Sequence, residues 1–297
     1  SRSQEEAITK LEAFLSGPEQ VYMLKGYAGS GKTTILKGLV SYLNEIEKDF
    51  SLMAPTGRAA KVIREKTGQE AFTIHKSIYS YDDMVEIEDG DSFFYNYKIR
   101  NNVDVVGKIF IVDEASMLSD AKSEGEFFRF GTSHLLTDLI TYTRVSHDNV
   151  KSKIIFVGDP CQLPPVGDSS SKAFEPDYIK ANFNLSCVEA EMKEVQRQTS
   201  DSAILDRAAN LRKSISSGFF NDFNLRPNGK DILNPSYETF LQTWQNTENS
   251  KIIIASKNKT CLDLNKQIRE KRFGNASLPI QKSDIVIMGG NNYKKGI

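Results

Sequence analysis

The feature that most constrains the fold is a glycine-rich segment near the start of the chain, Gly26-Tyr27-Ala28-Gly29-Ser30-Gly31-Lys32-Thr33. It follows an apolar run at 21–25 and precedes an amphipathic stretch at 34–43, so it is predicted to join a strand to a helix. This is the GxxxxGK[ST] pattern in its required context. The alternative is a plain glycine-rich turn, which the strand–loop–helix context disfavours.

The chemistry of this segment predicts ATP and Mg²⁺ as ligands. Glycines allow backbone N–H groups to surround phosphates, and the N-terminus of the next helix favours negative charge. Lys32 is predicted to reach the β and γ phosphates, and the Thr33 hydroxyl to bind Mg²⁺. The predicted nucleotide-binding residues of the segment are Gly26, Ala28, Gly29, Ser30, Gly31, Lys32, Thr33 and Thr34.

Apolar runs alternate with amphipathic stretches through the first 185 residues, as expected for parallel strands joined by crossover helices. The sequence therefore predicts an α/β fold with a parallel sheet. In such sheets ligands bind beyond the carboxyl ends of the strands. The predicted strands are 21–25, 51–54, 108–112 and 153–157.

Two further strand ends carry polar residues suited to this chemistry. Asp113 and Glu114 follow the strand at 108–112, where Asp113 would bind the metal and Glu114 would activate a water molecule. Gln162 follows the strand at 153–157, where it could contact the γ-phosphate. The alternatives are a solvated acidic loop for the first pair and a rigid proline-rich turn around Gln162.

The remaining segments predict an inserted hairpin and a second domain. Residues 81–104 contain acidic and aromatic runs around Asp89-Gly90-Asp91, which is typical of a β-hairpin with a tight turn. After 185, helices are expected at 203–214 and 259–272 and strands at 251–255 and 283–288. We expect a first domain at 1–185 and an incomplete second domain at 186–297.

Composition excludes several classes of protein. With 297 residues there is room for about two domains. There is no apolar run of 18 residues and no secretory leader, and the three cysteines are too few and too scattered for a disulfide framework, so a cytoplasmic protein without a membrane partner is expected. The net charge of −1 does not exclude nucleic acid, because a bound strand needs only a local basic track.

Taken together, the motifs resemble those of superfamily 1 DNA helicases, most closely the RecD-like and Dda-like branch that moves 5′ to 3′. The segments that carry the resemblance are Gln4, the phosphate loop, 54–61, 73–76, 113–117, 158–166 and 194–198. It implies a RecA-like ATPase domain and the beginning of a second one. No segment resembles motifs V and VI, so the chain is expected to be truncated before them.

The resemblance also implies roles for individual residues. Gln4 would recognise adenine, and Arg197 would contact the γ-phosphate, which makes Lys32, Glu114, Gln162 and Arg197 the expected catalytic residues. The alternatives without a functional role are an exposed helix start for Gln4 and a surface ion pair with Glu194 for Arg197. The residues that would contact DNA are Pro55, Thr56, Gly57, Arg58, His75 and Lys76.

The hairpin lies where the resembled branch carries a strand-separating pin. Its expected separating residues are Phe93, Phe94, Tyr95 and Tyr97. Two alternatives remain for these groups: Thr56 and His75 could be capping or packed polar residues, and the hairpin aromatics could simply cover the first domain.

The expected activity is ATP-dependent movement on single-stranded DNA with unwinding of forked duplexes. Recombination or replication proteins are possible partners. Two alternatives are a nucleotide-gated DNA-binding subunit of a recombination or repair complex and a P-loop NTPase, such as a small-molecule kinase, that does not act on DNA.

Overall fold

The computed structural model describes residues 1–89, 92–103, 105–123, 125, 128–194, 202–220, 226–248, 251–275, 279–282 and 284. The chain divides into two compact units, Ser1–Ser200 and Asp201–Ile297. This division lies beyond the expected boundary at 185, because a strand at 187–192 belongs to the sheet of the first unit.

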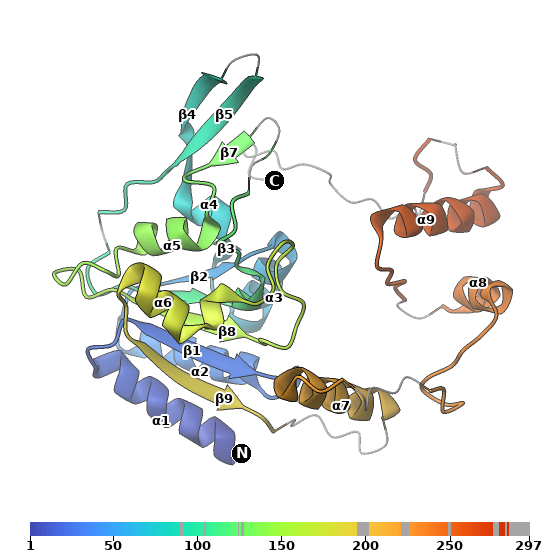
Figure 1. Cartoon of the computed structure of the whole chain (residues 1–297), viewed down its shortest axis with the longest axis horizontal. Helices are drawn as coiled ribbons and strands as arrows, with labels where there is room; N and C mark the ends of the chain where they lie inside the picture. The colour runs from blue at the N-terminus through green and yellow to red at the C-terminus, as the bar shows by residue number, and fades with distance from the viewer. Residues whose placement is uncertain are drawn as a thin grey trace. The chain divides into compact units, whose positions relative to one another are not determined.

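The first unit is built on a six-stranded sheet in the order β3-β2-β6-β8-β1-β9 (Figure 1). Every pairing in it is parallel, which confirms the predicted α/β class. All four predicted strands are present within a residue or two of their expected bounds. The strands are β1 (Val21–Gly26), β2 (Phe50–Ala54), β3 (Ala71–Thr73), β6 (Ile109–Val112), β8 (Lys153–Gly158) and β9 (Cys187–Met192).

Helices cover both faces of this sheet. Alternating strand residues point to opposite faces, so Tyr22 and Ile155 belong to one core while Met23 and Ile154 belong to the other. One core is completed by α1 (Arg2–Ser16), α2 (Lys32–Glu45) and α3 (Gly57–Thr67), and the other by α4 (Ile74–Ile78), α5 (Leu135–Thr143) and α6 (Pro176–Phe183). Short 3-10 helices, η1 (Ala115–Met117) and η2 (Lys172–Phe174), add to the second core.

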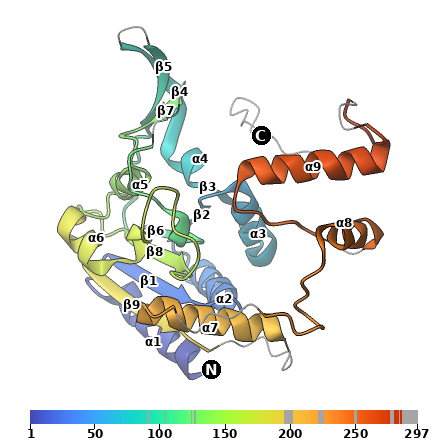
Figure 2. The ribbon, with the colours of Figure 1, turned by 45° about the vertical axis from the view of Figure 1, so that its right-hand side comes forward.

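The predicted hairpin is part of a second, smaller sheet. β4 (Tyr79–Asp89) and β5 (Ser92–Ile99) pair in antiparallel fashion, as predicted. A third strand, β7 (Phe128–Phe130), pairs with β5 in parallel and was not predicted. The outer part of β4 and β5 extends away from the helical layers in both views (Figures 1 and 2).

The described part of the second unit contains α7 (Ala203–Ser217), α8 (Tyr237–Asn246) and α9 (Asn258–Phe273). The helices expected at 203–214 and 259–272 are therefore confirmed. The strand expected at 251–255 is wrong, because this segment is irregular and Ile252 and Ile254 are exposed. A strand needs ladder partners, and the described residues of this unit supply no other strand. Most of 283–288 lies outside the described residues, so a second RecA-like domain stays a prediction.

Across the described residues, no helix is both long enough and apolar enough to cross a lipid bilayer.

Ile154→Ala is expected to lower the free energy of unfolding of the first unit by about 2–5 kcal/mol, because this side chain in the central strand β8 is fully buried and its loss leaves a cavity. Ile46→Ala is the matched control, since its side chain is 48% exposed at the end of α2. Urea unfolding of both variants measures the difference. Equal losses would contradict the two-sided core.

Candidate functional site

Three of the predicted motifs meet at one edge of the large sheet. β8 lies between β1 and β6, so the phosphate loop after β1, the carboxylates after β6 and the turn after β8 share that edge. Electrostatic interactions confirm the proximity, because Lys32 acts on both Asp113 and Glu114, and Asp159 acts on Glu114. Three motifs that are far apart in the sequence therefore lie close together in the fold.

The glycine-rich loop adopts a conformation that its glycines permit. Gly29 and Gly31 have positive φ values of 83° and 96°, a region that favours glycine. A Cβ at Gly31 would lie 2.3 Å from Gln4 Nε2, so this position also requires a residue without a side chain. Gly31 caps α2 without a side-chain hydrogen bond, and the first N–H groups of a helix have no partners within it. The loop therefore offers backbone donors to an anion.

Two side chains of this loop bear on phosphate binding. Ser30 is fully buried, and its Oγ has no hydrogen-bond partner among the described residues. Lys32 Nζ donates to the carbonyl oxygens of Gly26 at 2.6 Å and Tyr27 at 3.1 Å, which holds the ammonium group over the loop. A buried orphan hydroxyl and a cation beside backbone donors fit a polyphosphate ligand.

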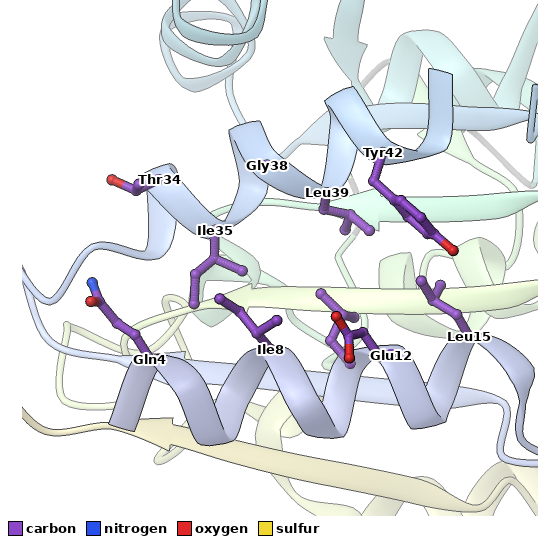
Figure 3. Close-up of a pocket in the computed structure, with 10 residues that line it drawn as sticks. Gln4, Ile8, Glu12, Leu15, Thr34, Ile35, Gly38, Leu39 and Tyr42 are labelled. Carbon is purple, nitrogen blue, oxygen red and sulfur yellow. The ribbon is translucent and has the colours of Figure 1, made fainter. Parts of the chain in front are cut away.

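Gln4 lies beside the loop, at one end of a cavity between α1 and α2. Its Nε2 donates to Ser30 O at 3.1 Å. The cavity has a volume of about 520 Å³, and Figure 3 shows Gln4 facing Thr34 at the end nearest the loop and Tyr42 at the other end. Aliphatic side chains such as Ile8 and Ile35 line it between these ends. An apolar slot with an amide at its mouth can accept a planar base.

The two carboxylates after β6 are partly desolvated, and the backbone of Glu114 is strained. Burial raises the pKa of Asp113, and this effect is opposed by the Glu114 N–H, which donates to Asp113 Oδ1 at 2.9 Å, and by the Lys32 charge. Glu114 has a left-handed backbone with φ 53°, a conformation that is strained for a residue with a side chain. Its Oε2 is buried and has no hydrogen-bond partner within the described chain.

The pKa of Glu114 is raised by burial first and by the neighbouring charge of Asp113 second. The attraction of Lys32 opposes both effects. A carboxylate whose basicity is increased and whose lone pairs are unused is suited to accept a proton from water. Strain and pKa perturbation together mark Glu114 as a functional candidate.

The turn after β8 presents Gln162 to solvent. Asp159 is buried, and its Oδ1 accepts a hydrogen bond from the Cys161 N–H at 3.0 Å. Its carbonyl oxygen accepts one from the Gln162 N–H at 3.0 Å. The Gln162 side chain is exposed at the same sheet edge as the phosphate loop. Arg197, the fourth predicted catalytic residue, lies outside the described residues.

Thr33 and Asp113 provide only oxygen donors, a hydroxyl and a carboxylate. Oxygen donors are the ligands that Mg²⁺ prefers. Because Asp113 is half-buried with a raised pKa, a nearby divalent cation would relieve the cost of its charge. The residues present therefore fit the predicted metal.

The predicted DNA-contacting residues follow β2, which lies next to β6 in the sheet, and β3, which lies on the other side of β2. Thr56 caps α3, its Oγ1 accepting a hydrogen bond from the Ala59 N–H at 3.2 Å. Thr56 is therefore a capping residue, and its contact with DNA stays a prediction. Pro55, Gly57, Arg58 and Lys76 lie at the starts of α3 and α4, and Arg58 and Lys76 are exposed.

His75 is packed rather than freely exposed. Its ring lies 5.1 Å from that of Phe130 and 5.5 Å from that of Tyr79. Burial lowers the pKa of His75, and the charge of Asp138 opposes this shift. His75 is therefore packed next to the foot of the hairpin sheet, and its contact with DNA stays a prediction.

The described aromatic residues of β5 pack against β7. Tyr95 stacks on Phe128 with ring centres 5.9 Å apart, and Tyr97 stacks on Phe130 at 5.0 Å. Phe94 is buried, and the Arg129 guanidinium group lies 3.5 Å from the centre of its ring. Nothing is described of the Phe93 side chain.

Two features of this region escaped the sequence analysis. β7 has only three residues, and its Phe-Arg-Phe alternation was its one signal. Asp138 is fully buried within the apolar helix α5. A single acid inside an otherwise apolar run could have indicated a buried polar network.

Comparison with known proteins gives one family and several relatives. The family described as "AAA domain" matches residues 4–168. An uncharacterized protein of Methanocaldococcus jannaschii is 34% identical over 170 residues, which is 55% of this chain and 12% of the relative.

Two further relatives carry RecD names, and one of them is named as a DNA helicase. The ATP-dependent RecD2 DNA helicase of Deinococcus radiodurans is 29% identical over 50% of this chain and 16% of its own length. RecD, a subunit of the RecBCD enzyme of Buchnera aphidicola, is 26% identical over 60% of this chain and 28% of its own length. These matches confirm the RecD-like resemblance of the motifs, and each spans less than a third of the relative.

Stability is expected to fall as the pH is lowered through about 6.5, the ordinary pKa of histidine, because of His75. Its pKa in the folded chain lies below the ordinary 6.5, so the unfolded chain takes up the proton first as the pH is lowered. His75→Gln should flatten this pH dependence, as measured by urea unfolding across the range. His147→Gln, at an exposed position, is the control. An unchanged slope in His75→Gln would contradict the burial of this ring.

Proposed function

The chain belongs to the AAA domain family, and we propose that it hydrolyses ATP to move along single-stranded DNA and unwind forked duplexes in the 5′ to 3′ direction. The observation that carries the proposal is the order of motifs along one sheet edge. The phosphate loop, Asp113, Glu114 and Gln162 follow β1, β6 and β8, and the predicted DNA-contacting residues follow the adjacent strands β2 and β3. The polarity and the unwinding activity rest on resemblance to the RecD-like branch.

In this proposal the chain's own residues divide the work of hydrolysis. Glu114 accepts a proton from the attacking water, a role supported by its raised pKa and its unpaired Oε2. Lys32 turns from the loop carbonyls toward the phosphates, and Gln162 and Arg197 contact the γ-phosphate. The amide of Gln4 selects the base at the mouth of the α1–α2 cavity.

Thr33 and Asp113 would hold Mg²⁺. When bound, this ion neutralises charge on the transferred phosphoryl group. The remaining electrostatic stabilisation comes from Lys32 and the backbone N–H groups of the loop.

DNA would be held by Pro55, Thr56, Gly57, Arg58, His75 and Lys76. Because Thr56 caps α3 and Thr73 caps α4, the two helix starts are fixed on adjacent strands. Helix starts with exposed cations suit phosphate groups of a strand. Thr56 and His75 would then act mainly by fixing this surface, while Arg58 and Lys76 supply the charge.

A second candidate follows from one relative. RecD is named as a subunit of the RecBCD enzyme, so this chain could instead serve as a nucleotide-gated DNA-binding subunit of a recombination complex. A P-loop enzyme acting on a small molecule is the third candidate. ATP turnover by the full-length protein with and without DNA separates them, because a DNA-binding subunit would bind DNA without turnover and a small-molecule enzyme would ignore DNA.

Lys32→Ala is expected to abolish ATP turnover, because it removes the cation at the phosphate loop. Glu114→Gln should retain ATP binding and slow hydrolysis by about 10²- to 10⁴-fold. Turnover and nucleotide binding are measured separately, with Lys37→Ala on the exposed side of α2 as the control. Hydrolysis by Glu114→Gln at the wild-type rate would refute its role as the base.

Replacing Arg58 and Lys76 together with alanine should weaken binding to single-stranded DNA and flatten its salt dependence. Each lost phosphate contact lowers the slope of log K against log salt by roughly 0.7. Fluorescence anisotropy at several salt concentrations measures this slope. The matched control is the double replacement of the exposed residues Lys37 and Lys180. Equal slopes in the two double variants would exclude this DNA surface.

A further inference from the structure

The small hairpin sheet joins the rest of the first unit at its base. α4 ends at Ile78 and β4 begins at Tyr79, so no linker separates the helix from the strand. At the other side, β7 ends at Phe130 and α5 begins at Leu135. Figure 1 shows α4 and α5 at the foot of the sheet. Residues between these elements therefore determine how the sheet is held.

Asp138 on α5 connects both sides of this base. It is fully buried and accepts a hydrogen bond from Tyr79 Oη at 2.7 Å, from Thr132 Oγ1 at 2.7 Å and from the Thr132 N–H at 3.1 Å. Gly131 permits this approach, because a Cβ there would lie 2.2 Å from Asp138 Oδ2. One carboxylate thus holds the first residue of β4 and the turn that follows β7.

The donors to Asp138 are neutral, so its carboxylate is stabilised by hydrogen bonds and not by an ion pair with one of them. A buried carboxylate is costly unless its lone pairs are satisfied. Burial raises the pKa of Tyr79, and its hydrogen bond to Asp138 raises it further, so the phenol remains a donor. Removing one donor leaves part of the buried charge without a partner.

The neighbouring residue of α5 contacts the segment that follows Glu114. The Thr137 N–H and Thr137 Oγ1 each donate to Asp120 Oδ1 at 2.9 Å. Tyr178 Oη also donates to Asp120, at 2.7 Å. Ser119 donates to Asp168 at 2.6 Å, which ties this segment to the loop after β8. The first turns of α5 therefore hold the segment after Glu114 through Asp120 and the hairpin sheet through Asp138.

We infer that Asp138 is the positioning residue of the hairpin sheet: it fixes the base of β4 and β7 on α5, so that the orientation of the sheet follows the segment after Glu114. The role in unwinding rests on the proposed function, whereas the anchoring does not. Asp120 and Thr137 form the other half of the connection.

The test removes donors to Asp138 without altering packing. Tyr79→Phe deletes the hydroxyl that reaches Asp138, and Tyr22→Phe is the matched control, because Tyr22 is also fully buried and donates to Ala7 O at 2.6 Å on the opposite face of the sheet. Thr132→Ala deletes the second donor at an exposed residue, with Thr9→Ala at an exposed position of α1 as its control. The exposed pair keeps the test valid if the tyrosine variants fold poorly.

Two measurements on the full-length protein distinguish anchoring from unwinding. Hydrogen exchange of peptides covering 79–99 and 128–134 should be faster in Tyr79→Phe and Thr132→Ala, and unchanged in the controls. Base pairs unwound per ATP hydrolysed should fall roughly 3- to 10-fold in the two variants while DNA-stimulated turnover is retained.

Each result has one meaning. Exchange in the hairpin peptides that matches the controls overturns the anchoring role, whatever the unwinding assay gives. Faster exchange with unwinding per ATP unchanged overturns the coupling of the sheet to the catalytic segment. If the two variants exchange faster but the wild-type protein itself does not unwind DNA, the anchoring is supported and the proposed helicase function is refuted.

Discussion

The burial of the central strands on both faces is the constraint on which the rest of the structure depends. β1, β6 and β8 are apolar along almost their whole length and are covered by helices on each side. Such strands have no room for functional polar groups along their length. Charged and flexible residues are therefore confined to the segments after the strands, and the parallel arrangement brings those segments to one edge.

Two carboxylates of the first unit are removed from solvent in opposite ways. Asp138 is fully buried and satisfied by three hydrogen bonds from Tyr79 and Thr132, so its charge specifies one arrangement of the elements around it. Glu114 has an unpaired oxygen, a raised pKa and a strained backbone. Satisfied buried charge favours rigidity, whereas unsatisfied charge beside a phosphate loop favours chemistry.

The parts of the fold that were predictable depend on local signals. Lys32, Asp113, Glu114 and Gln162 could be assigned to strand ends because each follows an apolar run, and the parallel class follows from the alternation of runs and helices. β9 was missed because its exposed edge reads as polar, with Glu189 and Glu191 among its six residues. β7 was missed because its partner strand β5 lies far away in sequence, and the role of Asp138 was missed because Tyr79 precedes it by 59 residues. The segment 251–255 was apolar and β-branched, but propensity alone does not supply a neighbouring strand.

The packing of the hairpin aromatics is compatible with a strand-separating arm, although it changes what those rings would contribute. A two-stranded hairpin is only marginally stable in water, and an arm that bends cannot transmit force to a base pair. The third strand β7 and the stacking of Tyr95 and Tyr97 on Phe128 and Phe130 stiffen the inner part of the arm. Because these rings stack on β7, they would make the arm rigid. Contact with a duplex would then be made by the outer part of β4 and β5. Rigidity matters only if the base of the arm is fixed, which is why the buried carboxylate of Asp138 and the stacked rings belong to one mechanical unit.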